Sequence, residues 1–356
     1  MKVCIIGAGL SGLSCALTLE KYGIMPDIYE QFDRCGGRVT FITTLLQIMN
    51  RPIKDPLTDL ARRYGISITP INILNRMVMF TPCNMGTARG FLGYIFERGP
   101  SPRALDSQLT RKLSAQIKYS TVADFKELSQ KYDRVVVATG SPYIAKEMGC
   151  WTDVFRGWVR GALVEGEFDP TTWITWFNKS YANNGYAYLG PVNSRNASLV
   201  LIASDIREDE AESRWKKFLS TEKIRCIEKD SFLLEHIAGI CQPKEVGNIL
   251  LVGNAGGFME SFLGFGIYNA IASGVLAAQA IYEKTSYQAK MSYLDKTIHQ
   301  SIPIRRALNM IGNSGYDSLL GLIKIPLLNN LIYNTNINFL ELEASALSLV
   351  EPLLKK

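Results

Sequence analysis

A glycine-rich turn near the start of the chain constrains the fold more than any other feature. The turn, residues 7–12, reads Gly-Ala-Gly-Leu-Ser-Gly and joins an apolar stretch at residues 2–6 to an apolar helix expected at residues 13–22. A second apolar stretch follows at residues 26–29. Strand, glycine turn, helix and second strand in this order predict a βαβ unit that binds a dinucleotide.

Each glycine of the turn has a defined task in such a unit. Gly7 allows the tight turn, Gly9 lets the backbone approach a pyrophosphate, and Gly12 lets helix and strand pack closely. At the start of the helix, around Ala8 and Ser11, free N–H groups and the helix dipole favour an anion. The alternative is a glycine turn with a purely structural role.

Glu30 stands at the end of the second strand, eighteen residues past the last glycine. A carboxylate at this place accepts hydrogen bonds from ribose hydroxyls and disfavours a 2′-phosphate. We therefore expect FAD or NAD at this turn, and not NADP.

Composition limits the function classes. The 356 residues carry a formal net charge of +6 without a long Lys/Arg run, which argues against nucleic-acid binding. Seven dispersed cysteines without a C-x-x-C pair argue against structural zinc and against a disulfide framework. Residues 2–19 superficially resemble a signal peptide, but the glycine motif explains them better, and no apolar run is long enough to span a bilayer. We expect a cytoplasmic protein.

Residues 31–38 form a loop rich in glycine and arginine. Adjacent glycines, including Gly37, allow a ligand to approach the backbone beside Gln31, and Arg38 is suited to phosphate oxygens. A surface turn with solvated arginines is the alternative. Farther along, residues 133–140 read as a parallel strand buried on both faces. Small residues that leave room for a ligand end this strand, namely Ala138, Thr139 and Gly140.

The rest of the chain alternates helix and strand signals. Helices are expected at residues 55–64, 106–113, 208–219 and 266–282, strands at 117–121 and 248–252, a β-meander at 66–96, and an antiparallel sheet at 158–205. Residues 232–240 read as short and irregular. The tail after Ser301 is helical and apolar, and it forms either a packed helix pair or a helix lying on a membrane surface.

These pieces in this order resemble the FAD-dependent family that includes geranylgeranyl reductases and the wider hydroxylase-type flavoproteins. The resemblance is carried by residues 7–12 with Glu30, 35–37, 186–191 and 251–267. The last stretch is the most specific, because residues 253–258 and 264–267 look like the family's second flavin-binding motif. The matching stretches span about residues 1–285 and leave the apolar tail uncovered.

The resemblance implies an α/β fold in which a Rossmann-type FAD-binding domain, with a parallel sheet and a β-meander, is interleaved with an antiparallel-sheet substrate domain. A C-terminal helical tail completes it. The FAD-binding domain is expected over residues 1–65, 98–150 and 240–285, the substrate domain over 66–97 and 151–239, and the C-terminal helices over 286–356.

The resemblance also implies further cofactor-binding residues, namely Arg98, Gly253, Asn254, Gly264, Gly266 and Ile267. Asn254 stands where the family has an acid, and its carbonyl oxygen can still accept a hydrogen bond from a ribityl hydroxyl. If Cys35 is placed as in the prenyl reductases, it lies near the isoalloxazine and acts as a proton donor or a redox-tuning thiol. An inert thiol is the alternative.

Tyr186 and Tyr188 belong to a stretch that resembles a reductase signature and are candidate catalytic residues. Tyr188 stands where tryptophan is usual and Gly190 where phenylalanine is usual, which predicts a widened or reshaped pocket. The two histidines, His236 and His299, are expected at the surface, and the alternative is that His236 projects from its irregular loop into the pocket.

Three functions follow from this resemblance. The leading hypothesis is an FAD-dependent reductase of carbon–carbon double bonds in an apolar, isoprenoid- or lipid-like substrate, with NAD(P)H or a ferredoxin-type protein as electron donor. The runner-up is a monooxygenase of the aromatic-hydroxylase type, although the Asp-Gly pair usual in those enzymes is missing after the strand ending at Gly140. The third is a flavin-binding protein without turnover. Peripheral membrane contact through the apolar tail accompanies the first hypothesis.

Overall fold

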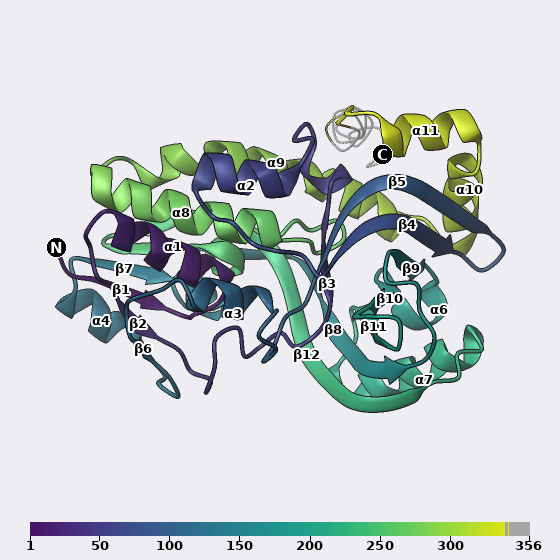
Figure 1. Ribbon diagram of the computed structural model, residues 1–356, viewed down its shortest axis with the longest axis horizontal. Coiled ribbons are helices and arrows are strands. Elements are labelled where there is room, and N and C mark those ends of the chain that lie inside the picture. The colour runs from purple at the N-terminus through teal and green to yellow at the C-terminus, as the bar shows by residue number, and fades with distance from the viewer. Residues whose placement is uncertain (339–340, 342–356) are drawn as a thin grey trace.

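The computed structural model describes residues 1–338 and 341, and its strands form two sheets that lie side by side in Figure 1. Sheet A has the strand order β13-β14-β7-β1-β2-β6, and all neighbouring strands are parallel except the pair β13–β14. Its strands are β1 (Val3–Ile6), β2 (Asp27–Tyr29), β6 (Ile117–Lys118), β7 (Arg134–Val137), β13 (Glu245–Val246) and β14 (Ile249–Leu251). The predicted Rossmann-type sheet is confirmed.

Sheet B has the strand order β12-β8-β11-β10-β9-β4-β5-β3 and is antiparallel except for the parallel pair β4–β9. Its strands are β3 (Thr43–Leu46), β4 (Asn72–Phe80), β5 (Met85–Phe96), β8 (Trp151–Glu165), β9 (Thr172–Trp176), β10 (Tyr186–Pro191), β11 (Asn196–Ser204) and β12 (Ile227–Cys241). The antiparallel sheet predicted at residues 158–205 is confirmed.

Eleven α-helices and three short 3₁₀ segments complete the described part of the chain. The α-helices are α1 (Leu10–Lys21), α2 (Pro56–Tyr64), α3 (Leu105–Thr110), α4 (Phe125–Lys131), α5 (Tyr143–Glu147), α6 (Lys179–Ala182), α7 (Ala211–Thr221), α8 (Ile267–Glu283), α9 (Tyr287–Met310), α10 (Asn313–Ile323) and α11 (Pro326–Asn334). The 3₁₀ segments are η1 (Ile48–Asn50), η2 (Glu208–Glu210) and η3 (Gly253–Gly256). None of the helices in the described ranges combines the length and the hydrophobicity that crossing a bilayer requires. The predicted helical tail is present as α9, α10 and α11, and its last part falls outside the described residues.

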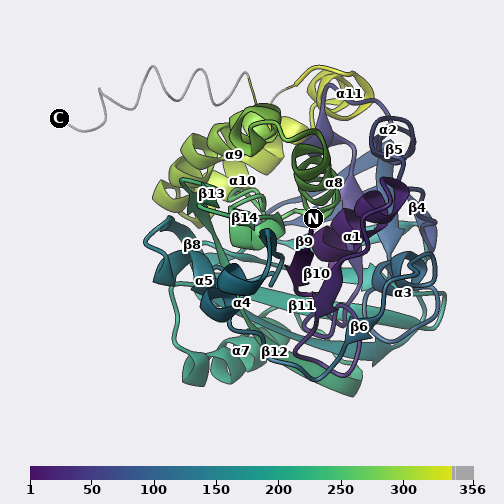
Figure 2. The same cartoon turned by 90° about the vertical axis from the view of Figure 1, so that its left-hand side faces the viewer.

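Alternate side chains of β1 point to opposite faces of sheet A, as a strand buried on both sides requires. Val3 and Ile5 pack in the core that contains residues of α1 and α8. Cys4 and Ile6 pack on the other face, in the core that contains residues of α4 and α5. Figure 2 shows the two helix layers apart, α1 and α8 in one and α4 and α5 in the other. Both faces are therefore covered, and the continuous apolar sequence of β1 is explained.

Helices α1 and α8 press against one another because glycines replace side chains at their contact. A Cβ atom on Gly274 in α8 would lie 2.1 Å from the carbonyl oxygen of Ser11 in α1. A Cβ on Gly12 would lie 2.0 Å from the carbonyl oxygen of Gly7. The first helix is thus fixed between the glycine turn and α8, as the spacing of the motif predicts.

The prediction that residues 232–240 are short and irregular is wrong, because they form the second half of β12, which pairs with β8 along almost its whole length. Two register shifts, one between Glu228 and Asp230 and one between Ala238 and Gly239, interrupt the alternation that marks a strand in sequence. The first half of β12 is also exposed at the sheet edge, and it therefore carries charged residues.

Candidate functional site

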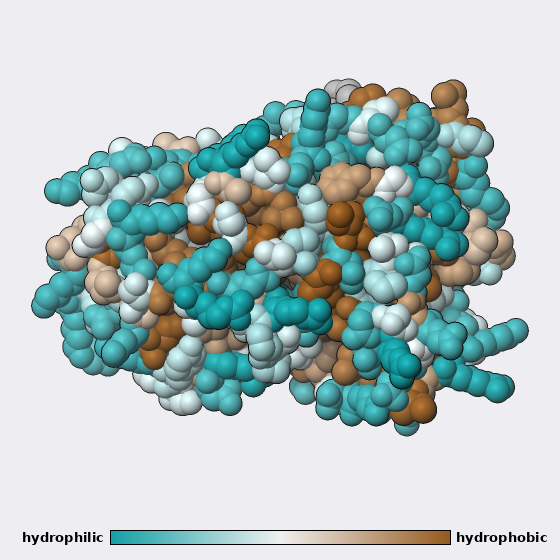
Figure 3. Space-filling model, in the orientation of Figure 1, coloured by the Kyte–Doolittle hydropathy of each residue, from teal (hydrophilic) through white to brown (hydrophobic). Residues whose placement is uncertain are grey.

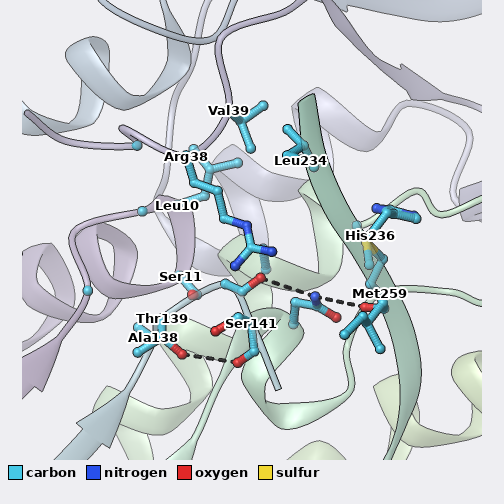
Figure 4. Close-up of a pocket in the computed structure, with 18 of the residues that line it drawn as sticks. Leu10, Ser11, Arg38, Val39, Ala138, Thr139, Ser141, Leu234, His236 and Met259 are labelled. Atoms are coloured by element: carbon cyan, nitrogen blue, oxygen red, sulfur yellow. Dashed lines mark hydrogen bonds between the residues drawn. The ribbon is translucent and has the colours of Figure 1, made fainter. Parts of the chain in front are cut away.

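A cavity of about 720 Å³, here called the main cavity, lies between the glycine turn of sheet A and one face of sheet B. The close-up in Figure 4 shows Leu10 and Ser11 on one side of it and Leu234 and His236, from β12, on the other. The loop that follows β7, drawn with Thr139 and Ser141, closes the lower side of this view. The volume of the main cavity is in the range of cofactor and ligand pockets.

The main cavity gathers most of the residues predicted from sequence. Those that line it are Gly7, Gly9, Ser11, Glu30, Gln31, Gly37, Arg38, Arg98, Ala138, Thr139, Gly140, Tyr186, Tyr188, Asn254, Gly264, Gly266 and Ile267. Four others, Ala8, Gly12, Cys35 and Gly253, are not among its lining residues. Ala8, Gly12 and Gly253 contact residues that line the cavity, namely Glu30, Gly7 and Ser11 respectively.

Glu30 ties the glycine turn to the end of β2. Its carboxylate accepts a hydrogen bond from the backbone N–H of Ala8 at 2.7 Å and another from Phe32 at 3.0 Å, and the residue is buried. Each carboxylate oxygen keeps lone pairs for a further donor. The group is therefore positioned to accept hydrogen bonds from vicinal hydroxyls of a ribose.

The glycine turn leaves the start of α1 open to the main cavity. Gly7 adopts a φ of +104°, and a Cβ there would lie 2.5 Å from the carbonyl oxygen of Ala138. Gly9 is the N-cap of α1, and no side chain caps the helix. A Cβ on Gly253 would meet the Ser11 hydroxyl at 2.5 Å, so the second glycine turn supports the first. The uncapped N–H groups of α1 suit an anion.

Arg98 is held by a buried carboxylate at the edge of the main cavity. Its guanidinium donates to Asp106 through Nε at 2.6 Å and Nη2 at 3.0 Å, a two-point geometry that fixes the plane of the group. Asp106 is fully buried, and a Cβ on Gly36 would lie 2.2 Å from its Cγ. The loop at residues 31–38 is therefore packed onto this ion pair.

Asn254 connects the two halves of the main cavity. Its Nδ2 donates to the carbonyl oxygen of Gly140 at 3.1 Å and to that of Ile237 at 3.0 Å, the two contacts dashed around one nitrogen in Figure 4. Its Oδ1 is shielded from solvent and has no hydrogen-bond partner among the described residues. Because two carbonyls can only accept, the amide orientation is fixed, and Oδ1 is left for a donor on a ligand. The residues present therefore fit a hydroxyl-bearing cofactor.

Cys35 faces the protein core. It is buried among apolar residues, and its Sγ lies 3.2 Å from the Tyr119 hydroxyl. Burial raises the pKa of this thiol, although hydrogen bonds with Thr110 and Tyr119 oppose the shift. A thiol in this position is poorly suited to donate protons into the main cavity.

The tyrosine hydroxyls of β10 are engaged with backbone carbonyls. Tyr186 donates to Leu263 at 2.7 Å and Tyr188 donates to Ile42 at 3.2 Å. Burial raises the pKa of both phenols. Both rings line the main cavity, and their hydroxyls hold the loops that border it.

Trp173 occupies the space that Gly190 leaves. A Cβ on Gly190 would lie 2.3 Å from the Trp173 ring, and this ring stacks on Tyr188 with centroids 4.7 Å apart. Trp173 lines the main cavity. Trp173, from the neighbouring strand β9, therefore fills the space beside Gly190.

The surface location predicted for His236 is wrong, because its ring borders the main cavity. The ring packs edge-on against Phe155, and a Cβ on Gly264 would lie 2.6 Å from its Nε2. Burial, reinforced by the charges of Arg38 and Arg305, lowers the pKa of His236 to about 4, so its imidazole is neutral near pH 7. In sequence, only the rarity of histidine marks this residue.

Glu260 organises the loop between the second glycine turn and α8. Its buried carboxylate accepts hydrogen bonds from the backbone N–H groups of Phe262 at 2.6 Å, Leu263 at 3.1 Å and Phe265 at 2.7 Å. Burial raises the pKa of Glu260 to about 7, although these hydrogen bonds and Arg305 oppose the shift. The loop, residues 260–266, forms part of the cavity wall.

A polar cluster joins sheet B to the loops of sheet A at the rim of the main cavity. Arg38 donates through Nη2 to the carbonyl oxygen of Glu235 at 2.9 Å, and Figure 4 shows its side chain reaching into the pocket. The Glu235 carboxylate accepts from Arg156 at 2.8 Å and from the Tyr143 hydroxyl. Burial lowers the pKa of Arg38.

Comparison with known proteins shows which proteins share the fold of this chain. Residues 5–54 match the family described as NAD(P)-binding Rossmann-like domain. The structure is similar to that of a geranylgeranyl bacteriochlorophyll reductase-like protein from Thermoplasma acidophilum, with a TM-score of 0.70, 16% identity, and 99% and 98% of the two chains covered. The chain shares its fold with flavin-dependent proteins. A flavin-dependent brominase variant gives a TM-score of 0.68 at 15% identity with both chains fully covered. Aklavinone-11 hydroxylase, in a complex with FAD and aklavinone, gives 0.60 at 14% identity, with 90% and 72% covered.

A curated relative matches over a short stretch of the chain. A protein described as possible lysine-specific histone demethylase 1, from Drosophila melanogaster, is 32% identical over 77 residues. The match covers 20% of this chain and 9% of that protein. It therefore concerns a small part of the relative.

Proposed function

We propose that the chain is an FAD-dependent oxidoreductase whose cofactor lies along the main cavity. The observation that carries the proposal is the convergence of two glycine-rich segments, residues 7–12 and 254–267, on one cavity although they are far apart in sequence. The match to a nucleotide-binding family and the shared fold with flavin-dependent proteins support it.

Different residues of the chain would bind different parts of the cofactor. Glu30 would accept hydrogen bonds from the ribose, the uncapped N-terminus of α1 would hold the pyrophosphate, and Asn254 Oδ1 would accept from the ribityl chain. Arg38 and Arg98 add positive charge along the same path. Reduced FAD supplies a hydride equivalent from N5.

We propose that the substrate is an apolar, isoprenoid- or lipid-like alkene and that the reaction is reduction of a carbon–carbon double bond. The part of the main cavity under sheet B is lined by aromatic and aliphatic side chains, namely Phe41, Val159, Trp173, Tyr186, Tyr188, Ile202, Leu234, Phe258 and Met259. These residues would hold the alkene and exclude water. Besides the hydride equivalent that bound FAD would supply, the reduction needs a proton at the alkene. With both tyrosine hydroxyls bonded to backbone carbonyls, we assign proton delivery to water entering from the rim rather than to Tyr186 or Tyr188.

The test of the proposal measures flavin binding and product mass. Purified protein titrated with FAD is expected to bind it, and Glu30→Gln is expected to weaken the affinity tenfold or more, because hydrogen bonds to a charged acceptor are lost. Glu127→Gln removes the same charge from an exposed ion pair on α4 and is expected to leave the affinity unchanged. Anaerobic turnover of a polyprenyl substrate should add two hydrogens. A colourless protein that refuses FAD would overturn the assignment.

A monooxygenase of the aromatic-hydroxylase type is the second candidate, since a hydroxylase shares the fold. It requires dioxygen and adds oxygen to its product, so product formed without dioxygen separates the two reactions. A flavin-binding protein without turnover is the third candidate, and it would hold FAD yet resist reduction by NAD(P)H, a ferredoxin or dithionite. We propose NAD(P)H or a ferredoxin-type protein as electron donor.

We also propose that α10 and α11 contact a membrane surface. They expose large apolar side chains, Leu322 and Leu327 being 53% and 77% exposed, and apolar surface appears over α11 at the upper right of Figure 3. The protein should co-sediment with anionic vesicles, and Leu327→Glu should reduce the bound fraction severalfold. Equal binding of the two proteins would contradict this contact.

A further inference from the structure

A second cavity, of about 260 Å³, lies between sheet B and the two C-terminal helices α10 and α11. Apolar side chains from every surrounding element line it, including Leu46, Met77, Met79, Leu92, Leu320, Ile323 and Ile332. Phe262 and Leu263, from the loop at residues 260–266, close the side toward the main cavity. This space does not belong to the cofactor site described above.

Most polar groups on the rim of the second cavity bind partners within the protein. Arg51 donates through Nε to Gln47 at 3.0 Å and through Nη2 to the carbonyl oxygen of Tyr333 at 3.3 Å. The Tyr333 hydroxyl donates to the Met79 sulfur at 3.5 Å, and Thr81 donates to Asp317 at 2.6 Å. An occupant therefore meets mainly hydrocarbon surface, which favours an apolar molecule.

The second cavity is large enough for an apolar group. An apolar cavity of about 150 Å³ can bind benzene or xenon. The second cavity, at about 260 Å³, exceeds that size and has room for several carbons of an apolar chain. Each methylene that such a chain buries against these side chains adds hydrophobic free energy to its binding.

The two cavities follow one another along the same face of sheet B. Thr44 and Leu46 are two residues apart on β3 and therefore point to the same face. Thr44 lines the main cavity, and Leu46 lines the second one. Leu263 lines both cavities, so its side chain lies at the boundary between them. A chain lying along β3 would pass from one into the other beside Leu263.

We propose that the second cavity holds the distal part of the substrate's apolar chain, an alkyl or isoprenoid tail, while the reacting double bond lies in the main cavity. This inference rests on the proposed function, because it assigns the far end of the same substrate. It makes α10 and α11 a cover over the tail, and Leu263 the side chain that the tail must pass.

The test compares ligands that differ only in length. 1-Hexanol and 1-undecanol are titrated calorimetrically into the purified protein, whatever its flavin content. Wild type is expected to bind undecanol at least tenfold more tightly, because each buried methylene adds hydrophobic free energy. Ile323→Trp, which fills the second cavity from α10, is expected to abolish this gain while leaving hexanol binding unchanged. Leu322→Trp places the same ring on the exposed side of α10 and is expected to keep the gain.

A second variant keeps the test valid if Ile323→Trp fails to fold. Leu92→Phe fills the cavity from the opposite wall, and it is expected to lower the gain in the same way. The inference would be overturned if folded Ile323→Trp and Leu92→Phe preferred undecanol over hexanol as strongly as wild type does. It would also be overturned if wild type bound the two alcohols with equal affinity. Flavin absorbance of the same samples is read separately. A protein that shows the length dependence but binds no FAD would contradict the proposed function and leave the apolar site standing.

Discussion

Asn254 acts at the scale of a single residue, because its amide joins the loop after β7 to strand β12. Both hydrogens of Nδ2 are used, one toward Gly140 and one toward Ile237. A carboxylate at this place would have no hydrogens to offer and would face two carbonyl oxygens. The asparagine amide therefore matches the two backbone carbonyls around it, while Oδ1 keeps an acceptor function.

Asn254→Asp should lose both hydrogen bonds and leave two carbonyls facing a charge. We expect a loss of about 2 kcal/mol in the free energy of unfolding, measured by urea denaturation, and weaker FAD binding in a flavin titration. Asn330→Asp is the control, because among the described residues the side chain of this exposed residue of α11 accepts a hydrogen bond from Asn334 and donates none, and the aspartate can still accept it. Unchanged stability and flavin affinity in Asn254→Asp would contradict this account.

At the scale of elements, local signals allowed some elements to be predicted and not others. The unit β1-α1-β2 was predictable because glycine spacing and a continuous apolar strand arise from contacts within thirty residues. Helix α2 was predictable from Asp55, which caps it through two backbone N–H groups, and from Gly65, which ends it. Strand β12 and the position of His236 were not, because pairing with β8, a long-range contact, decides them.

The candidate site divides in the same way. Its glycines and Glu30 carry a motif with fixed spacing, so the sequence placed them on one wall of the main cavity. The residues of the opposite wall come from several strands of sheet B, and the order of these strands in the sheet decides which side chains meet there. Trp173, which fills the space beside Gly190, comes from such a neighbouring strand, and no spacing in the sequence joins these two residues.

The contact of α1 with α8 gives a prediction at the element scale. Gly274→Ala places a Cβ 2.1 Å from the Ser11 carbonyl oxygen and must push the helices apart, at a cost of about 1–3 kcal/mol despite the better helix propensity of alanine. Gly321→Ala is the matched change in α10, where a Cβ would meet no atom within 4 Å. It should be neutral or stabilise by up to about 1 kcal/mol. Thermal unfolding measures both, and the account fails if the two variants behave alike.

At the scale of the whole molecule, the buried carboxyl of Glu260 and the partly buried imidazole of His236 make stability depend on pH in opposite directions. The raised pKa of Glu260 means that its neutral form is favoured by folding, so this stabilisation is present below pH 4.5 and is lost as the pH rises through 7. The lowered pKa of His236 means the reverse, a stabilisation present above pH 6.5 and lost as the pH falls through 4. The two contributions overlap and partly cancel between these limits.

Variants separate the two contributions. The free energy of unfolding of wild type minus that of Glu260→Gln should decrease by about 3 kcal/mol from pH 4.5 to pH 7.5. The reason is that only wild type must ionise a buried carboxyl as the pH rises. The difference between wild type and His236→Phe should increase over the same range, because only wild type must keep its imidazole neutral. Urea denaturation at a series of pH values gives both differences. If neither difference in the free energy of unfolding changed with pH, neither group would titrate as described.

The close contact between Ser11 and Gly274 also means that α1 cannot reach its final packing until α8 has been synthesised. About 260 residues separate these positions, and ribosomes add about 5–20 residues per second. For some tens of seconds, the first helix of a growing chain therefore waits without the helix that covers it. Its sequence is buried almost entirely in the finished fold, so during that interval its apolar surface is offered to chaperones, or to other nascent chains.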